Sequence, residues 1–183
     1  MTLTDQPQAD RPAEAATAWG EPRTRTVTWY DPMIGAGQGL RMAGLDYLRA
    51  IQRGELPPAP IGGLLQFDVA EVEEGRVAFT CRPDESAYNP IGVVHGGLVC
   101  TLLDSVTACA VHSTLPLGKG YTSIEIKVSY LRAVTARSGT LTATGTMVKG
   151  GSRVAFSEGV VTDESGTPVA TATSTCLVFD IPG

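Results

Sequence analysis

The stretch that decides the fold is NPIGVVHGGLVCTLLDSVTACAVHSTL, residues 89–115. From Gly96 onward its apolar residues fall nearly all around a helical wheel, and a helix that is apolar on every side is normally buried on every side. Asp104 is the one formally charged side chain between Glu85 and Lys119, and a carboxylate is costly to desolvate. The stretch therefore predicts a buried central helix over residues 96–115 with an acid at its middle.

Segments typical of β-strands lie on both sides of this helix. Two precede it and four follow at hairpin spacing: residues 64–72, 76–81, 121–131, 139–148, 153–162 and 168–179. Polar and apolar residues alternate clearly over residues 123–128, and the Gly-containing break at 149–152 suits a tight turn. We expect a single curved antiparallel sheet that wraps the helix, because no other element is available to cover it. The predicted fold class is α+β.

The residues before the sheet divide into two parts. Residues 1–37 mix Pro, Ala, Thr and Gly with few periodic apolar positions, which predicts an irregular arm. Over residues 40–53 apolar residues recur at helical spacing, until Gly54 and two prolines stop the pattern. We therefore expect an amphipathic helix and a Pro-rich linker within residues 38–60, packed on the main domain at 61–183. A lid over a substrate is the less favoured alternative for this helix.

The composition narrows the class of protein. A chain of 183 residues suits one domain with an appendage. The charged fraction of 18% is below the roughly 25% usual for soluble domains, so part of the surface is expected to be covered by partner subunits. With a formal net charge of -5, the chain offers no basic surface for nucleic acid or an anionic membrane.

Neither a metal site nor a secretory route is indicated. The four cysteines lack metal-ligand spacing and are expected to be reduced thiols: Cys81, Cys100, Cys109 and Cys176. The first residues lack the basic start and apolar run of a secretory signal, and no stretch approaches the roughly 18 apolar residues of a membrane span. A soluble, cytoplasmic protein is expected.

The turn that leads into the central helix contains residues that could form a site together with Asp104. Gly96 and Gly97 stand at the predicted helix start, where small residues let a ligand approach free backbone N–H groups. Such donors favour a developing negative charge and can form an oxyanion hole. Asp104 follows on the same helix, and its carboxylate supplies a base or nucleophile.

These residues resemble the PaaI-like acyl-CoA thioesterases of the hotdog fold. The resemblance covers roughly residues 61–180 and rests on Asn89, Gly92, His95-Gly96-Gly97, Asp104 and the strand over residues 122–130. It implies that Asp104 is the catalytic carboxylate and that Gly96 supplies the oxyanion amide. It also implies that Asn89 orients the water or the carbonyl group and that Ser123 helps to hold the attacking water.

The spacing of Gly96 and Asp104 has a consequence for assembly. Eight residues on one helix separate their backbones by roughly 12 Å. The attacking group and the oxyanion donor, however, must each lie about 3 Å from one carbonyl group. Two copies related by a two-fold axis meet this requirement when Gly96 of one helix faces Asp104 of the other. We therefore expect an obligate homodimer, and the resemblance implies further pairing into tetramers.

The expected reaction is hydrolysis of a medium-chain or aromatic acyl-CoA, with no cofactor beyond the CoA of the substrate. Asp104 would activate a water or attack the thioester directly, while Asn89 and His95 would order the water or the loop, His95 more by structure than by chemistry. A hydroxyl one turn beyond the carboxylate, which some relatives carry, is missing because Ala108 stands there. Gly97 is a candidate substrate-binding residue, and the candidate contacts to the CoA phosphates are the cations near the strand ends, Arg132, Arg137, Lys149 and Arg153.

Three other interpretations stay open. A hotdog hydratase or dehydratase needs a His paired with a carboxylate near the substrate β-carbon, and His95 with Asp104 could imitate that pair. A non-catalytic acyl-CoA-binding module would use the same pocket without turnover, although the sequence contains no helix-turn-helix or other output domain. A cysteine hydrolase would use Cys109 or Cys100 with His112, but no orienting acid follows on that helix.

Overall fold

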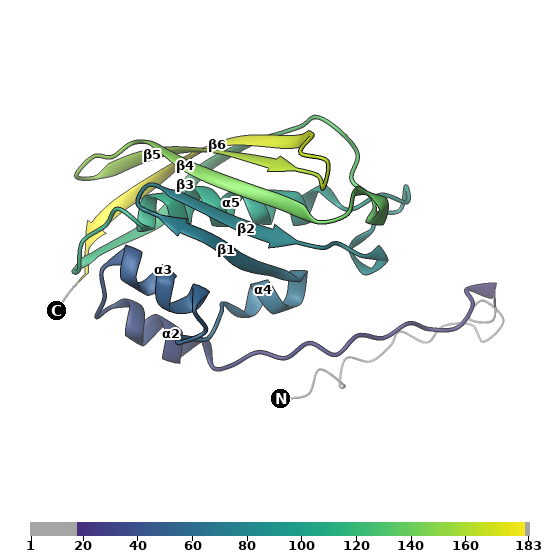
Figure 1. Cartoon of the computed structure of the whole chain (residues 1–183), viewed down its shortest axis with the longest axis horizontal. Coiled ribbons are helices and arrows are strands. Elements are labelled where there is room, and N and C mark those ends of the chain that lie inside the picture. Colours follow the sequence, from purple (N-terminus) through teal and green to yellow (C-terminus); the bar gives the residue numbers. More distant parts are fainter. Residues whose placement is uncertain (1–17, 182–183) are drawn as a thin grey trace.

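The computed structural model describes residues 18–181 and shows six strands curved around one long helix, α5 (Gly96–His112) (Figure 1). The strands lie in the order β1-β2-β4-β5-β6-β3 across the sheet, and every neighbouring pair is antiparallel. Their bounds are β1 (Phe67–Glu73), β2 (Arg76–Cys81), β3 (Lys119–Tyr130), β4 (Leu141–Lys149), β5 (Val154–Thr162) and β6 (Pro168–Asp180). The predicted α+β fold, a curved antiparallel sheet wrapped around an apolar helix, is confirmed.

The middle of α5 lies directly on the backbone of the sheet. Leu102, Leu103 and Val106 are completely buried there. Opposite them, Gly145 of β4 pairs with Gly159 of β5, and a Cβ atom added to Gly145 would lie 2.2 Å from the carbonyl oxygen of Val106. The two glycines therefore leave out the side chains that would hold the helix away from the sheet. The apolar burial that results is the dominant favourable term in folding.

A β-bulge in β3 changes which side chains face α5. The register with β6 shifts between Ser123 and Glu125, and the extra residue, Ile124, has 57% of its surface exposed. The polar–apolar alternation over residues 123–128 would place Ile124 on the same face as Ile126, but a bulge inserts one residue and reverses the alternation beyond it. Ser123 and Tyr121 contact α5 instead, through Asp104 and His112 respectively.

Three short helices lie beside the edge strand β1 (Figure 1). They are α2 (Pro32–Gly39), α3 (Gly44–Gln52) and α4 (Pro60–Leu65). The irregular arm predicted over residues 1–37 is therefore wrong from Pro32 onward, while residues 1–17 lie outside the described part of the chain. The carboxylate of Asp31 caps α2 by accepting a backbone amide, and a proline suits the first turn of a helix.

The glycines of α2 are packing positions and do not break the helix. A Cβ atom on Gly39 would lie 3.3 Å from the ring of Tyr47, and one on Gly35 would lie 3.6 Å from its hydroxyl oxygen. The missing side chains let α2 pack closely on α3. The amphipathic helix predicted over residues 40–53 is present, but it begins at Gly44 because the preceding residues form the turn between α2 and α3.

The first strand begins at Phe67, not at residue 64 as predicted, because the residues before it form α4. Pro60 begins this helix, and Gln66 ends it with φ 60° and ψ 47°. Within the described residues Gln66 is the only non-glycine with a positive φ. This left-handed residue turns the chain from α4 directly into β1.

The chain enters α5 at the end of the sheet that carries two 3-10 turns, η1 (Glu85–Ala87) and η2 (Ala136–Ser138). The backbone amide of Val94 donates to the carbonyl of Val134, and that of His95 donates to the carbonyl of Ala87. These bonds hold the loop before α5 against its neighbours. None of the helices in the described residues is long and apolar enough to span a membrane.

Candidate active site

The two edge strands, β1 and β3, do not pair with each other, and one face of α5 is accessible between them. A pocket of about 1200 Å³ lies in this opening. Asp104, Ala108 and His112 line it from α5, and β1, β3, α3 and the segment 54–62 supply the other walls. A concave site with an apolar lining and a few polar groups is the default place for a ligand.

Asp104 lies half-buried in this pocket. The hydroxyl of Ser123 donates a hydrogen bond of 3.0 Å to its Oδ1. Its second oxygen, Oδ2, has no hydrogen-bond partner among residues 18–181. The structure thus brings together two of the residues singled out from the sequence. It also explains how an apolar helix tolerates an acid, because Asp104 faces the one side of α5 that the sheet leaves open.

The first turn of α5 presents one free amide. The Nδ1 atom of His95 accepts the backbone N–H of Gly97 at 2.8 Å, so His95 is the N-cap of the helix and carries its proton on Nε2. The hydroxyl of Tyr130 donates to the carbonyl oxygen of Gly96 at 3.0 Å. Within the described part of the chain, the N–H of Gly96 has no acceptor. Gly96 therefore offers an oxyanion donor, whereas the amide of Gly97 is already occupied.

Asn89 shapes the loop that leads into α5. Its side-chain oxygen accepts the backbone amides of Ile91 at 3.1 Å and Val93 at 3.3 Å, and its backbone N–H donates to the carbonyl of Val93 at 2.8 Å. The side-chain oxygen is therefore committed to the loop. Only the side-chain NH₂ of Asn89 is left to meet a substrate or a water, since it has no partner in the described residues.

Gly96 and Asp104 stay two helical turns apart on α5, which corresponds to about 12 Å. One chain therefore does not bring the free amide and the carboxylate to the same carbonyl group. The distance between Gly96 and Asp104 that was inferred from the sequence therefore holds, because both residues lie within α5.

Comparisons with known proteins agree with this geometry. The sequence model of the thioesterase superfamily matches residues 91–170. A predicted esterase of Halobacterium salinarum is 38% identical over 131 residues, which cover 64% of this chain and 85% of that relative. The chain belongs to the thioesterase superfamily, with the hotdog fold.

Two solved structures extend the likeness to three dimensions. A predicted thioesterase related to phenylacetic acid degradation, from Ralstonia eutropha, is 31% identical with a TM-score of 0.65, and the match covers 72% of this chain and 98% of that one. A protein of Streptococcus mutans, solved bound to acetyl CoA, is 28% identical with a TM-score of 0.58, and the match covers 64% of this chain and 91% of the other. The protein is accordingly a thioester hydrolase.

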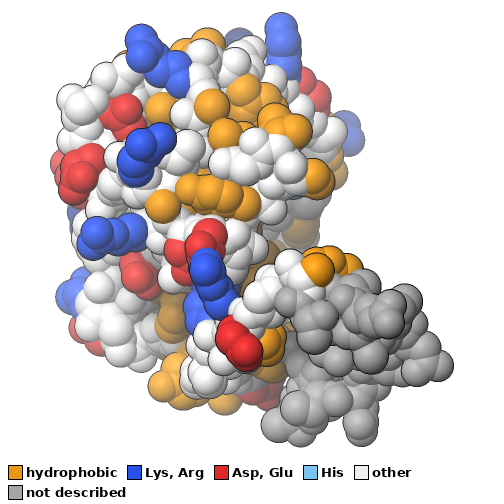
Figure 2. Space-filling view, turned by 90° about the vertical axis from the view of Figure 1, so that its right-hand side faces the viewer, with side chains coloured by type: hydrophobic (Ala, Val, Ile, Leu, Met, Phe, Trp, Pro, Cys, Tyr) orange, Lys and Arg blue, Asp and Glu red, His pale blue; other side chains and the backbone are white. Residues whose placement is uncertain are grey.

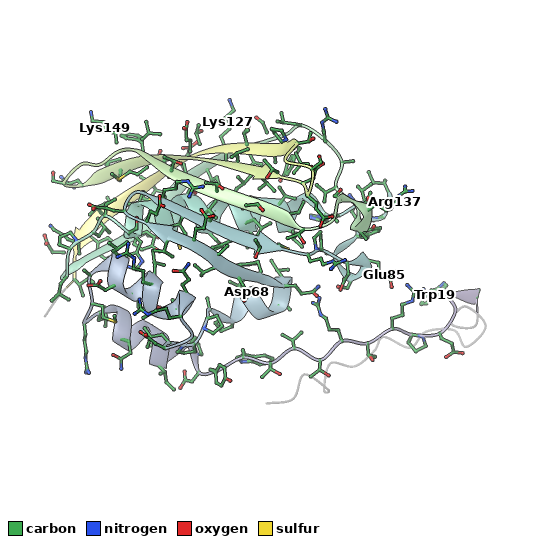
Figure 3. All side chains as sticks on the ribbon, in the orientation of Figure 1. Trp19, Asp68, Glu85, Lys127, Arg137 and Lys149 are labelled. Atoms are coloured by element: carbon green, nitrogen blue, oxygen red, sulfur yellow. The ribbon has the colours of Figure 1, made fainter. Side chains whose placement is uncertain are left out.

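The thioesterase does not gather its four candidate cations into one phosphate site. Arg132 and Arg137 lie at the end of the sheet where α5 begins, and Lys149 and Arg153 lie at the opposite end, around the turn between β4 and β5 (Figure 3). All four are exposed. Figure 2 looks onto the end that holds Arg137 and shows basic side chains dispersed among acidic and apolar ones. The contacts of these cations with a substrate stay predictions.

The far end of the pocket holds a polar group that the sequence did not reveal. The ring of His112 lies 5.6 Å from the ring of Tyr47 and 4.8 Å from that of Tyr121, measured between centroids. Burial lowers the pKa of His112 to about 4, so its imidazole is neutral at pH 7. No motif could have indicated this cluster, because its three members come from α3, α5 and β3.

The thiol of Cys109 is not activated in the thioesterase. Burial raises the pKa of Cys109 to about 12, and a thiol of that pKa holds almost no thiolate at neutral pH. The neutral thiol of Cys109 and the neutral imidazole of His112 therefore do not form a thiolate–imidazolium ion pair. All four cysteines are unpaired, as expected from their spacing.

The pair of His95 and Asp104 that a hydratase or dehydratase would need is not formed within one chain. His95 caps α5 and contacts Gly97, whereas Asp104 bonds to Ser123 on β3. No three His, Cys, Asp or Glu residues come together as a metal-holding group in residues 18–181. The expectation that no cofactor is needed stays a prediction.

Proposed function

We propose that the thioesterase hydrolyses acyl-CoA thioesters with a medium-chain or aromatic acyl group to the free acid and CoA. The related Streptococcus mutans protein binds acetyl CoA, and a hypothetical thioesterase of Streptococcus pneumoniae was solved with coenzyme A. These relatives support CoA as the carrier. The pocket beside Asp104 supports an acyl group of some size, because its walls are largely apolar.

The observation that carries the proposal is the state of the Asp104 carboxylate. Ser123 holds Oδ1 from one side, and Oδ2 is free in the pocket. A carboxylate held in this way can take a proton from a water that attacks the thioester carbonyl, or can attack the carbonyl carbon itself. In both routes the carbonyl oxygen gains negative charge and the C–S bond then breaks. In the first route the leaving thiolate of CoA takes the proton that Asp104 removed from the water. In the second route a mixed anhydride forms on Asp104, and a water molecule hydrolyses it to the free acid while its proton goes to the thiolate.

A second copy of the chain supplies the oxyanion donor in this proposal. The Gly96 amide is free at the start of α5, but about 12 Å of helix separates it from Asp104 in the same chain. Strand β3 supports a symmetric partner, because it is the outermost strand on its side of the sheet. Ile124 and Tyr130 on this strand are more than half exposed, and the unpaired backbone groups of an edge strand offer a template for pairing with another chain.

The carboxylate is tested with a thiol-release screen across acyl-CoA chain lengths and aryl-CoAs. Asp104→Asn keeps the shape of the side chain and is expected to lower kcat by about 10²- to 10⁴-fold, because the base or nucleophile is lost. Asp68→Asn is the matched control, since Asp68 lines the same pocket from β1 (Figure 3), and it is expected to leave turnover unchanged. Equal turnover by Asp104→Asn and wild type would contradict the proposal.

The shared site is tested by complementation between two inactive variants. Gly96→Pro removes the oxyanion N–H, and the backbone before it suits a proline because His95 is extended at φ -61° and ψ 131°. The ring would press on Tyr130, whose exposed side chain can move aside. Mixed dimers of Gly96→Pro with Asp104→Asn contain one intact site, so a random mixture is expected to recover about a quarter of wild-type activity. A monomer by light scattering, or no recovery by folded variants, would exclude the two-chain site.

A further inference from the structure

The pocket of the thioesterase continues well beyond the carboxylate. Asp104, Ala108 and His112 follow one another at intervals of four residues and so lie on one face of α5, and all three line the pocket. The eight residues from Asp104 to His112 span about 12 Å. The methyl group of Ala108 leaves the space between them open. An acyl chain whose thioester lies at Asp104 therefore has room along α5 toward His112.

The end wall of this pocket is made of three rings with polar atoms. The rings of Tyr47 of α3 and Tyr121 of β3 both lie close to His112, with centroid distances of 5.6 and 4.8 Å. Leu48 and Ile51 of α3 and Pro57 extend the wall on its apolar side. The long, largely apolar pocket thus ends at polar side chains. A hydrocarbon chain without polar atoms would cover these side chains and give them no hydrogen bond, which costs free energy.

The polar atoms of this wall are available to a ligand. Neither the hydroxyl of Tyr47 nor a ring nitrogen of His112 has a hydrogen-bond partner in residues 18–181. The one fully buried side-chain oxygen or nitrogen without a partner in that range is the Oγ of Ser157. The polar atoms of Tyr47 and His112 are therefore reachable from the pocket.

Both groups are held in the protonation state that suits a neutral ligand. Burial raises the pKa of Tyr47 above its usual value, so its phenol stays a donor. Burial lowers the pKa of His112, so its imidazole stays neutral, with one nitrogen that donates and one that accepts.

The wall is also fixed in place before a ligand arrives. The amide of Gly44, at the start of α3, donates to the carbonyl of Leu115 at 3.0 Å. A Cβ atom on Gly44 would lie 1.8 Å from the carbonyl oxygen of His112, so α3 touches the end of α5 directly. On its other side Tyr47 packs on Gly39 of α2. Such support lowers the entropic cost of ordering a binding group.

We propose that Tyr47 and His112 make the thioesterase selective for acyl groups that carry a hydroxyl or carbonyl oxygen at their far end. The length of α5 between Asp104 and His112 corresponds to about nine bonds of an extended acyl chain, at about 1.3 Å of advance for each bond, so an oxygen roughly eight to ten bonds from the thioester carbon reaches this wall. This selectivity rests on the proposed function, because Asp104 marks the position of the thioester.

A matched pair of substrates tests this selectivity. Octanoyl-CoA and 8-hydroxyoctanoyl-CoA differ only in the terminal hydroxyl. Wild type is expected to favour the hydroxylated substrate by about tenfold in kcat/KM, the effect of one hydrogen bond made in a largely dry site. Tyr47→Phe removes only the phenol oxygen and is expected to bring the ratio close to one. Its turnover of octanoyl-CoA reports that the variant is folded.

Tyr30→Phe is the control, because Tyr30 lines the same pocket but is 64% exposed and lies outside the end wall. It is expected to keep the wild-type ratio. Equal kcat/KM for the two substrates in wild type, or an unchanged ratio in Tyr47→Phe, would overturn the inference. Calorimetric binding of octanoate and 8-hydroxyoctanoate separates the two proposals. Tighter binding of the hydroxy acid, without turnover of any thioester, would support the proposed role of the end wall and contradict the hydrolase site. Equal binding of the two acids would contradict the proposed role of the end wall.

Discussion

Acid is expected to weaken the fold through His112, and His112→Gln is expected to remove this effect. The imidazole has a pKa of about 4 in the folded chain because of burial, against 6.5 for an ordinary histidine. Above pH 6.5 the imidazole is neutral in both the folded and the unfolded chain, so it does not change the free energy of unfolding. As the pH falls below 6.5, the unfolded chain takes up a proton that the folded chain resists, so stability decreases until about pH 4.

The size of the effect follows from these two pKa values. The whole difference between 6.5 and about 4 corresponds to about 3 kcal/mol, at about 1.36 kcal/mol for each pKa unit. At pH 5 most of that window has been crossed, and the loss is about 2 kcal/mol. The groups around His112 do not titrate there, because burial raises the pKa values of Tyr47, Tyr121 and Cys109.

Urea unfolding at pH 7.5 and pH 5.0 measures the effect as a difference between wild type and His112→Gln. The variant loses ring packing at both pH values, so a constant offset is expected, and only the change between the two pH values reports the proton. Wild type is expected to lose about 2 kcal/mol more than the variant. Equal losses in wild type and His112→Gln would refute the reasoning.

Two further substitutions, Gly145→Ala and Ser113→Ala, test close contacts of α5, and Gly37→Ala is the control for the first of them. Gly145→Ala places a Cβ atom 2.2 Å from the carbonyl oxygen of Val106 and is expected to cost at least about 3 kcal/mol in urea unfolding, because helix or sheet must shift. Gly37→Ala has no neighbour within 4 Å, so a gain of up to about 1 kcal/mol is expected from helix propensity, and equal effects of the two alanines would contradict the clash. Ser113→Ala leaves the amide of Gly75, which donates to Ser113 Oγ at 2.8 Å, without its partner. A loss of about 1–3 kcal/mol is expected by thermal unfolding, and an unchanged melting temperature would show that water replaces the hydroxyl.

The core of the fold was predictable because its signals lie within single segments. An all-apolar helix over residues 96–115 can only be buried, and the alternating segments around it can only cover it as a sheet. The role of Ser123 beside the attacking water, which the family resemblance implies, stays a prediction, whereas its hydrogen bond to Asp104 became visible only in the structure. The helix α2 was missed, because its glycines look like breaks until Tyr47 is seen to fill the space beside them.

Local pattern and tertiary contact divide the site in the same way. The sequence by itself determined the buried helix, the single acid on it and the two turns that separate Asp104 from Gly96, because spacing along one helix is set by its rise per residue. Tertiary structure alone decided that the bulge after Ser123 leaves this residue facing Asp104 and that Tyr47, His112 and Tyr121 meet at the end of one pocket. Those three residues lie on separate elements, and their meeting depends on how closely α3 packs on the end of α5, which no periodicity within either element encodes.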